Sequence, residues 1–318
     1  MDCGEGGAGM SELLYEKIMK GDWINRGPNG DAIVDNESLL DSMDNCEVIK
    51  INNVADYYWK SKQTYWSYET DFPNVAPPFN KFFMEFTIPQ EICTHDRGFT
   101  DSLITKGMKY GSFFTSKKIE DDENIKWFYN VLHFAAGTNV FLYPAASVMA
   151  VSSEGNIIEY DYKFDGKSIE KTFVATMIGE QGKSLNDIFF GDLTSAISQV
   201  FLFPELLAIS FMHCKNVNVI ENKPSRIPGI RNRHKPKITY KTLEIEPMKK
   251  VLQTEGDIEN NGLKKALHIC RGHFKDFREK GLFGRFHDIY WWDSQVRGKI
   301  ENGMVIKNYD VKTPRGDA

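Results

Sequence analysis

Residues 268–277, with the sequence HICRGHFKDF, bring together side chains that can transfer protons and bind anions. In an extended strand side chains alternate between two faces, which places Arg271, His273 and Lys275 together and His268 opposite them. An imidazole that titrates near neutrality can move protons, while guanidinium and ammonium groups hold phosphate oxygens. The pattern therefore indicates phosphate chemistry: either binding of a polyanion, or metal-free cleavage of a phosphodiester with one histidine as base and another as acid.

A second stretch of basic and aromatic residues follows at 284–292, GRFHDIYWW. Arg285 and His287 share one face of the strand expected there, Trp292 ends the stretch, and Arg297 comes next in VRG. Aromatic rings stack on unpaired bases, so basic residues interleaved with aromatic residues suit single-stranded RNA or DNA. The two stretches together predict a nucleic-acid site in the last third of the chain.

Two sets of candidate site residues follow. If the protein is a nuclease, His273 transfers the proton, Arg271 stabilises the phosphorane, and His268 or His287 is the partner histidine. A basic loop at 226–237, RIPGIRNRHKPK, offers further phosphate contacts, although a solvated linker explains it equally well. The residues predicted to contact nucleic acid are Lys275, Arg285, Trp292, Arg297, Arg231, Arg233 and Lys235.

The basic stretch also allows roles without catalysis. Its histidines can simply bind backbone or carboxylate partners, or the stretch can bind a phosphate or a peptide without any chemistry. Zinc is a further alternative, because residues 268–270 (HIC) and His213–Cys214 could supply ligands. Structural zinc sites usually pair ligands two to four residues apart, however, and no C-x-x-C occurs. The common nucleotide, zincin and hydrolase motifs are also missing, so we expect neither a metal nor a cofactor.

Charge is unevenly distributed along the 318 residues, whose net charge is −5. Residues 215–318 carry 22 Lys and Arg against 13 Asp and Glu, whereas residues 1–214 carry 17 against 31. A basic tail joined to an acidic body favours a polyanion-binding surface on the tail. The alternative is that the two parts neutralise each other across an interface.

The compartment is predicted from what the sequence lacks. No apolar run reaches the roughly 18 residues that a membrane helix needs, and the N-terminus, MDCGEGGAGM, has no secretory signal pattern. The five cysteines are an odd number and widely scattered, which argues against a disulfide framework. We therefore expect a cytoplasmic protein without membrane partners.

The predicted fold is α+β, with a helical or mixed N-terminal part around central apolar helices and a small antiparallel β-rich C-terminal domain. Three segments are expected: a disordered tip at 1–10, an acidic aromatic-rich domain at 11–214 and a basic domain at 215–318. Hydrophobic spacing predicts helices in 11–20, 57–71, 123–136, 184–203 and 205–214. Strands are expected at 81–88, 139–151, 156–164, 216–221, 238–246, 266–274, 285–292 and 303–311.

The tail also resembles a known protein family. The segments that carry the likeness are LLAISFMHCKNVNVIENKP, RNRHKPKITYKTLEIEP, ALHICRGHFKDFREKGLFGRFHDIYWWDSQVRG and GMVIKNYDV, roughly the last 115 residues. They resemble phage and mobile-element proteins similar to a type V anti-CRISPR protein that blocks biosynthesis of its target nuclease. The matching positions are His268, Arg271, Gly272, His273, Phe274, Trp292, Arg297 and Gly298.

The resemblance implies a protein that acts at translation in a bacterial host cell, with one surface for a nascent peptide and one for RNA or the ribosome. We therefore predict a phage-encoded anti-defence or host-takeover factor that lowers expression of a target, contacting its mRNA through the basic domain. Metal-independent ribonuclease activity is left open by the residues. The alternative is a non-catalytic protein-interaction module that occludes a partner, with a zinc-stabilised module as a third hypothesis.

Overall fold

Aromatic and β-branched residues from the acidic part of the chain and from the start of the basic part build a large mixed β-sheet. The computed structural model describes residues 12–21, 23–25, 34–61, 66–68, 71–88, 108–164, 167–171, 173–177, 198–224, 238–246, 266–270, 273–282, 284, 286–292, 295–297 and 299–304. The chain divides into a body unit, Met1–His213 with Val217–Glu244, and a tail unit, Cys214–Asn216 with Ile245–Ala318. The strands expected at 216–221 and 238–246, which the charge pattern assigned to the basic domain, lie almost wholly in the body unit.

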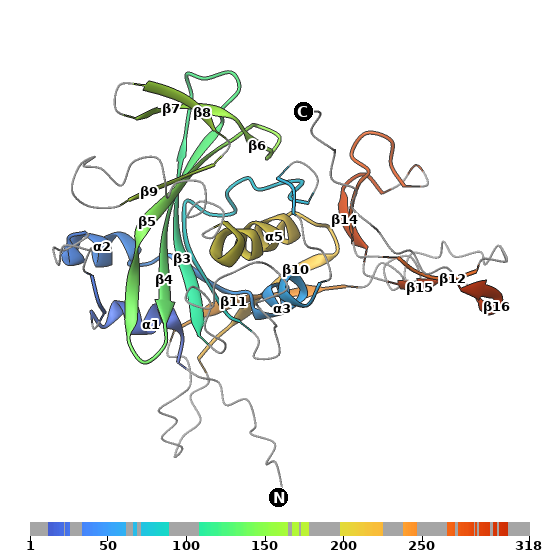
Figure 1. Ribbon diagram of the computed structural model, residues 1–318, viewed down its shortest axis with the longest axis horizontal. Coiled ribbons are helices and arrows are strands. Elements are labelled where there is room, and N and C mark those ends of the chain that lie inside the picture. The colour runs from blue at the N-terminus through green and yellow to red at the C-terminus, as the bar shows by residue number, and fades with distance from the viewer. Residues whose placement is uncertain are drawn as a thin grey trace, which may run out of the picture. The chain divides into compact units, whose positions relative to one another are not determined.

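Nine strands of the body unit pair in the order β10-β11-β1-β2-β3-β4-β5-β6, and β9 also pairs with β5 (Figure 1). A separate pair is formed by β7 and β8. The bounds are β1 Glu47–Lys50, β2 Lys81–Thr87, β3 Lys109–Lys118, β4 Trp127–Ala136, β5 Val140–Val151, β6 Ile157–Ile158, β7 Tyr160–Phe164, β8 Lys167–Lys171, β9 Phe173–Met177, β10 Val217–Asn222 and β11 Tyr240–Ile245.

Strand directions change within this sheet. β1 is parallel to both of its neighbours, since Val48 lies opposite Phe83 of β2 and Ile49 lies opposite Lys241 of β11. From β2 to β6 each strand is antiparallel to the next. β4 is paired on both sides along its length, apart from a register shift between Leu132 and Phe134. The sheet is therefore mixed, and residues about 190 positions apart in the chain are neighbours in it.

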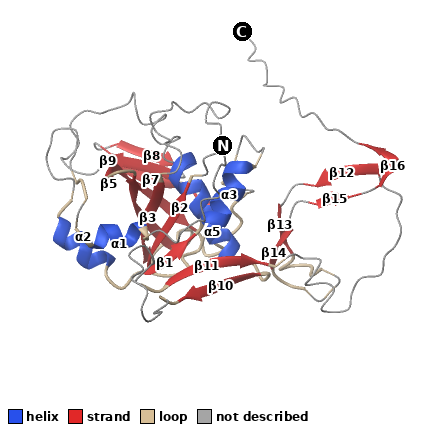
Figure 2. Ribbon diagram, turned by 90° about the horizontal axis from the view of Figure 1, so that it is seen from below, coloured by secondary structure: helices blue, strands red, loops and turns tan. Residues whose placement is uncertain are grey.

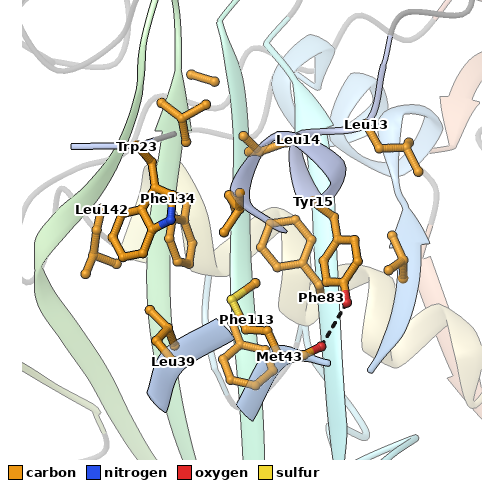
Figure 3. Packing of buried hydrophobic residues seen from close by; sticks show 14 of the residues in the cluster. Leu13, Leu14, Tyr15, Trp23, Leu39, Met43, Phe83, Phe113, Phe134 and Leu142 are labelled. Atoms are coloured by element: carbon orange, nitrogen blue, oxygen red, sulfur yellow. Dashed lines mark hydrogen bonds between the residues drawn. The ribbon is translucent and has the colours of Figure 1, made fainter. Parts of the chain in front are cut away.

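Two short helices, α1 (Leu14–Met19) and α2 (Asn36–Met43), cover one face of the sheet (Figures 1 and 2). Their apolar residues pack on Phe83, Phe113 and Phe134, which come from three adjacent strands (Figure 3). The Tyr15 hydroxyl donates a 2.9 Å hydrogen bond to the Met43 carbonyl and so ties the two helices together. Short helices of this length are marginal alone, and this burial is what stabilises them.

The other face is covered by α3 (Asn52–Lys60) and α5 (Phe203–Met212) (Figure 2). The π-helical turn η2 (Ser198–Leu202) leads directly into α5. Every residue of α5 from Phe203 to Phe211 is buried. Phe201 of η2 lies with its ring centroid 5.2 Å from that of Tyr110 and 4.8 Å from that of His133. This layer therefore encloses an imidazole of strand β4 within an apolar, aromatic setting.

The predicted helical N-terminal part with central apolar helices is wrong, because the centre of the body unit is the sheet. Of residues 123–136, which were expected to be a helix, Trp127–Ala136 form strand β4 instead. Both faces of this strand are covered, so apolar residues occur on both of them and mimic a helical spacing. In the region expected to be helical at 184–214, only η2 and α5 lie within the described residues, and they cover the sheet rather than forming the centre.

Several local predictions are confirmed. A helix occupies part of 11–20 as α1, and strands occupy 81–88 and 216–221 as β2 and β10. The helix expected at 57–71 is present only at its start, because α3 spans Asn52–Lys60. The hairpin expected around SSEG is present, since β5 and β6 pair antiparallel with Val151 opposite Ile157. The disordered tip predicted at 1–10 lies outside the described residues. In the part of the chain that the structure describes, no helix is long and apolar enough to cross a membrane.

The tail unit contains two small sheets. One has the order β15-β12-β16 and the other joins β13 to β14. β12 is parallel to β16 and antiparallel to β15, so the first sheet is mixed. The prediction of an antiparallel sheet is wrong for this part of the tail unit. The bounds are β12 Ala266–Cys270, β13 His273–Asp276, β14 Ile289–Trp292, β15 Gln295–Arg297 and β16 Lys299–Met304.

Candidate nucleic-acid interface

The β13–β14 hairpin carries the best-described part of the predicted site. The antiparallel register places His273 opposite Trp292 and Lys275 opposite Tyr290. Directly opposed residues of an antiparallel pair share a face, so these four side chains lie together. Phe274 falls on the other face, where its ring centroid is 4.7 Å from that of Trp291. The strand thus presents His273 and Lys275 side by side, as the alternation of the sequence predicts.

Lys275 and Trp292 form the closest pair on this face. The Lys275 ammonium lies 4.5 Å from the centroid of the Trp292 ring, a cation–π distance. Trp292 itself is 7% exposed and packs in a cluster with Tyr290 and Phe286. The buried Trp292 ring therefore contacts the ammonium of the half-buried Lys275 and does not offer an open face on which a base could stack.

The two described histidines of the hairpin have different settings. His273 is exposed at the start of β13. His287 is also exposed, and its ring lies over Gly281, where an added Cβ would come within 2.6 Å of His287 Cε1. Gly281 has a φ of 62°, a left-handed conformation that glycine adopts readily. The close ring and the left-handed backbone both require glycine at this turn.

Acidic residues lie among the Lys and Arg residues of the β13–β14 hairpin. Asp276 accepts hydrogen bonds from Arg278, and this pairing holds the pKa of the Asp276 carboxyl below its ordinary value. Both side chains are more than 40% exposed, so solvent weakens the pair. The described part of 273–292 holds three Lys and Arg (Lys275, Arg278, Lys280) and three Asp and Glu (Asp276, Glu279, Asp288). The basic excess of the tail therefore comes from other positions.

The remaining predicted site residues are only partly placed. In the first tail sheet, His268 of β12 is the backbone partner of Arg297 of β15. The predicted residues outside the described part of the chain are Arg271, Arg285, Arg231, Arg233 and Lys235. The catalytic arrangement of His273, Arg271, His268 and His287 thus stays a prediction, while the adjacent placement of His273 and Lys275 is observed.

Asn216 is a residue of the tail unit that the sequence patterns do not single out. Its side-chain oxygen accepts a 2.9 Å hydrogen bond from the Trp291 amide, and its Nδ2 donates to the carbonyls of Trp291 at 3.0 Å and Glu246 at 2.8 Å. Lys215 adds a backbone bond to Ile289 at 2.9 Å. The buried amide of Asn216 therefore fixes β14, and nothing in the sequence distinguishes it from a loop asparagine.

The zinc alternative gains no ligand cluster among the described residues, which contain no group of three or more His, Cys, Asp or Glu able to hold a metal ion. His213 Nε2 lies 2.8 Å from the Ala76 carbonyl oxygen, to which it donates. Burial lowers the pKa of His213 and raises that of the Cys214 thiol. The half-buried His213 and the buried Cys214 are thus both favoured in their neutral forms.

Comparison of the chain with protein families, characterised proteins and solved structures gives no match.

Proposed function

We propose that the tail unit binds the phosphate backbone of RNA through the face of β13 that carries His273 and Lys275. The observation that supports this most directly is the Lys275 ammonium, positioned over the buried Trp292 ring and two residues from an exposed imidazole. A cation held on a rigid aromatic base loses less side-chain freedom when it meets a phosphate than a free lysine does. The tail unit supplies the wider positive field, with 15 Lys and Arg against 11 Asp and Glu.

The wider role we propose is that of a phage-encoded anti-defence or host-takeover factor, which recognises a target protein or nascent peptide and lowers expression of its mRNA. Support for this comes from the tail motifs that resemble a type V anti-CRISPR family, and from the joining of an acidic body to a basic tail. The site favours binding over cleavage, because His273 and Lys275 are the predicted groups that lie together on the described hairpin.

Fluorescence anisotropy with a labelled single-stranded RNA, repeated over a range of salt concentrations, tests the binding face. We expect Lys275→Gln to weaken binding and to reduce the slope of log K against log salt by about 0.7, the value for one lost phosphate contact on a single strand. Lys118→Gln, which removes an exposed lysine of the body unit, is the matched control. Equal slopes for wild type and Lys275→Gln, with the near-ultraviolet circular dichroism of the variant unchanged, would refute the site.

The same protein and RNA also distinguish RNA binding from RNA cleavage. Incubation with RNA in the presence of a chelator reports metal-independent cleavage, and His273→Ala removes the predicted proton-transfer group. Cleavage that survives the chelator and disappears in His273→Ala would establish the ribonuclease. Salt-sensitive binding without cleavage is the result we expect.

A second candidate function, a protein-interaction module, is favoured by strand β10. This strand is at the edge of the nine-stranded sheet, and its Val219 and Ile220 side chains are 39% and 40% exposed. The Glu246 N–H bonds to the Asn216 carbonyl at 2.8 Å. If β10 and β11 continue as an antiparallel pair from this bond, we expect the N–H and C=O groups of Val219 and Glu221 to point away from β11. An extended peptide with apolar and basic residues would complete such an edge.

If a peptide binds as an additional strand beside β10, the changes in nuclear magnetic resonance signals should be confined to that edge of the sheet. Titration with an extended heptapeptide that alternates valine and lysine should shift the backbone amide signals of Val219 and Glu221 more than those of β4. Val219→Pro removes the outward N–H while leaving the bonds to β11, and should abolish the shifts. Shifts that persist in Val219→Pro would exclude this edge as the binding site.

A further inference from the structure

The aromatic side chains of the β13–β14 hairpin pack against one another. The ring centroid of Phe277 lies 5.6 Å from that of Trp292 and 6.2 Å from that of Tyr290. Phe286 adds a further contact, with its ring centroid 6.2 Å from that of Tyr290. Tyr290 and Trp292 lie on the face of the hairpin that carries Lys275. The aromatic rings of this face therefore contact each other within a small core.

No phenylalanine, tyrosine or tryptophan ring of the tail unit is exposed in the part of the chain that the structure describes. Phe274 and Phe277 are half-buried, and the other four rings are buried: Phe286, Tyr290, Trp291 and Trp292. Stacking on an unpaired base requires an open ring face. These rings therefore do not form a platform on which bases can stack.

Imidazole rings can also stack on bases, and the described part of the hairpin has two exposed ones. His287 lies against the backbone of Gly281, where an added Cβ would come within 2.6 Å of its ring. His273 lies on β13 beside Lys275, two residues away and therefore about 7 Å along the strand. An imidazole presents an N–H in either protonation state, and an ammonium presents only N–H groups. His273 and Lys275 thus form a pair of hydrogen-bond donors on one face.

The side chains of this face favour recognition of charge over recognition of a base or a sugar. The Lys275 ammonium, 4.5 Å from the Trp292 ring centroid, is a point charge that attracts any phosphate. Phosphate contacts position a nucleic acid but carry no sequence information, whereas bases are read by donor and acceptor pairs or by stacking. The four side chains paired across this face include no carboxylate and no amide: His273, Lys275, Tyr290 and Trp292.

We propose that this face contacts phosphates alone, with His273 and Lys275 on successive phosphates of a single strand that runs along β13. Neither the base nor the 2′-hydroxyl contributes to the affinity of the face, so single-stranded DNA suits it as well as RNA does. The inference rests on the proposed binding of RNA by the tail unit and specifies what is recognised there. Selectivity for one transcript has to come from other contacts.

Three labelled strands of equal length test the inference by fluorescence anisotropy with the full chain at one salt concentration: oligouridine, oligodeoxyuridine and an abasic deoxyribose strand. All three have the same number of phosphates. The first two differ in the 2′-hydroxyl, and the last two differ in the base. The quantity compared is the factor by which Lys275→Gln or His273→Gln raises the dissociation constant for each strand. This factor isolates the contribution of the face from contacts made elsewhere.

Each variant should raise the three dissociation constants by the same factor to within about twofold, the scatter of independent contributions. Lys118→Gln, which removes an exposed lysine of the body unit, should leave all three dissociation constants unchanged. Stacking of one base strengthens binding by roughly fivefold to more than a hundredfold. A factor about fivefold larger for oligodeoxyuridine than for the abasic strand would therefore show that a base is read and would overturn the inference.

A factor larger by the same margin for oligouridine than for oligodeoxyuridine would overturn the inference as well, because the 2′-hydroxyl would then be read. Either result leaves the proposed RNA binding intact. Binding of the wild type to none of the strands, or variants that bind all of them as the wild type does, would instead refute the proposed site itself. If Lys275→Gln fails to fold, the exposed His273 allows the same comparison with His273→Gln alone.

Discussion

The buried imidazole of His133 makes the stability of the body unit dependent on acid in a way that can be calculated. Burial lowers its pKa to about 3. The same side chain in the unfolded chain has a pKa of about 6.5. Between these values the unfolded chain binds a proton that the folded protein does not, so the free energy of unfolding decreases as pH falls through this window. From pH 7.5 to pH 4 the loss is about 3 kcal/mol for this one group.

Urea denaturation at pH 7.5 and pH 4 measures this loss. The test compares the wild type with His133→Gln, because other buried acids also titrate. Burial raises the pKa of Glu85 to about 6, and a raised carboxyl pKa makes stability fall as pH rises from about 4.5, the opposite direction. His133→Gln should therefore lose about 3 kcal/mol less than the wild type between the two pH values. His287→Gln, which removes an exposed imidazole, is the matched control.

The reasoning fails if the wild type and His133→Gln lose the same stability between pH 7.5 and pH 4, since the imidazole would then titrate alike in the folded and unfolded chains. If His133→Gln is too unstable to compare, Ser147→Ala is the second variant. This variant deletes the hydroxyl that hydrogen-bonds to Nε2 of His133, 2.6 Å away, while the ring stays buried. The free energy of unfolding of Ser147→Ala should therefore depend on pH as that of the wild type does.

Two further predictions concern packing and positioning. A Cβ at Gly111 would lie 2.7 Å from the Met84 carbonyl oxygen and 2.8 Å from the Phe83 ring, so Gly111→Ala should reduce the free energy of unfolding by about 2 kcal/mol. At Gly137 the nearest atom is 3.7 Å away, so Gly137→Ala should change stability by less than about 1 kcal/mol; chemical denaturation compares the two. Asn216→Ala removes three hydrogen bonds, two of them buried, and should destabilise the tail unit by about 3 kcal/mol, with faster hydrogen exchange at the Trp291 amide. Unchanged exchange there would mean that β14 is fixed by other contacts.

Local patterns predicted many of the elements but not the architecture. Alternation and turn residues located β2, β10 and the β5–β6 hairpin, because each depends on neighbours close in sequence. The strand β4 was missed, since Tyr129 and Val131 are buried on one face and Phe134 on the other, so no polar face marks it as a strand. Parallel pairing of β11 with β1 joins distant segments, and a single sequence has no local signal for it.

The candidate site was predicted in part for the same reason. Two-residue alternation placed His273 and Lys275 on one face, as the β13–β14 register has them. It did not predict that the Trp292 ring would be covered, because the burial of an aromatic ring depends on Phe286 and the rest of its cluster. The same alternation also did not predict the buried hydrogen bonds of His133 with Ser112 and Ser147. These residues become neighbours only when three strands align.

The parallel pairing of β1 with β11 has a consequence for synthesis of the protein. Strand β1 ends at Lys50, but the strand that completes its outer side begins at Tyr240. A ribosome adding roughly 5–20 residues per second needs on the order of ten seconds or more to make the intervening stretch. During that interval the backbone of β1 has one unsatisfied side, and the growing chain is vulnerable to wrong strand partners. Chains released before residue 240 would keep that vulnerability permanently, so full-length synthesis is itself a requirement for a closed sheet.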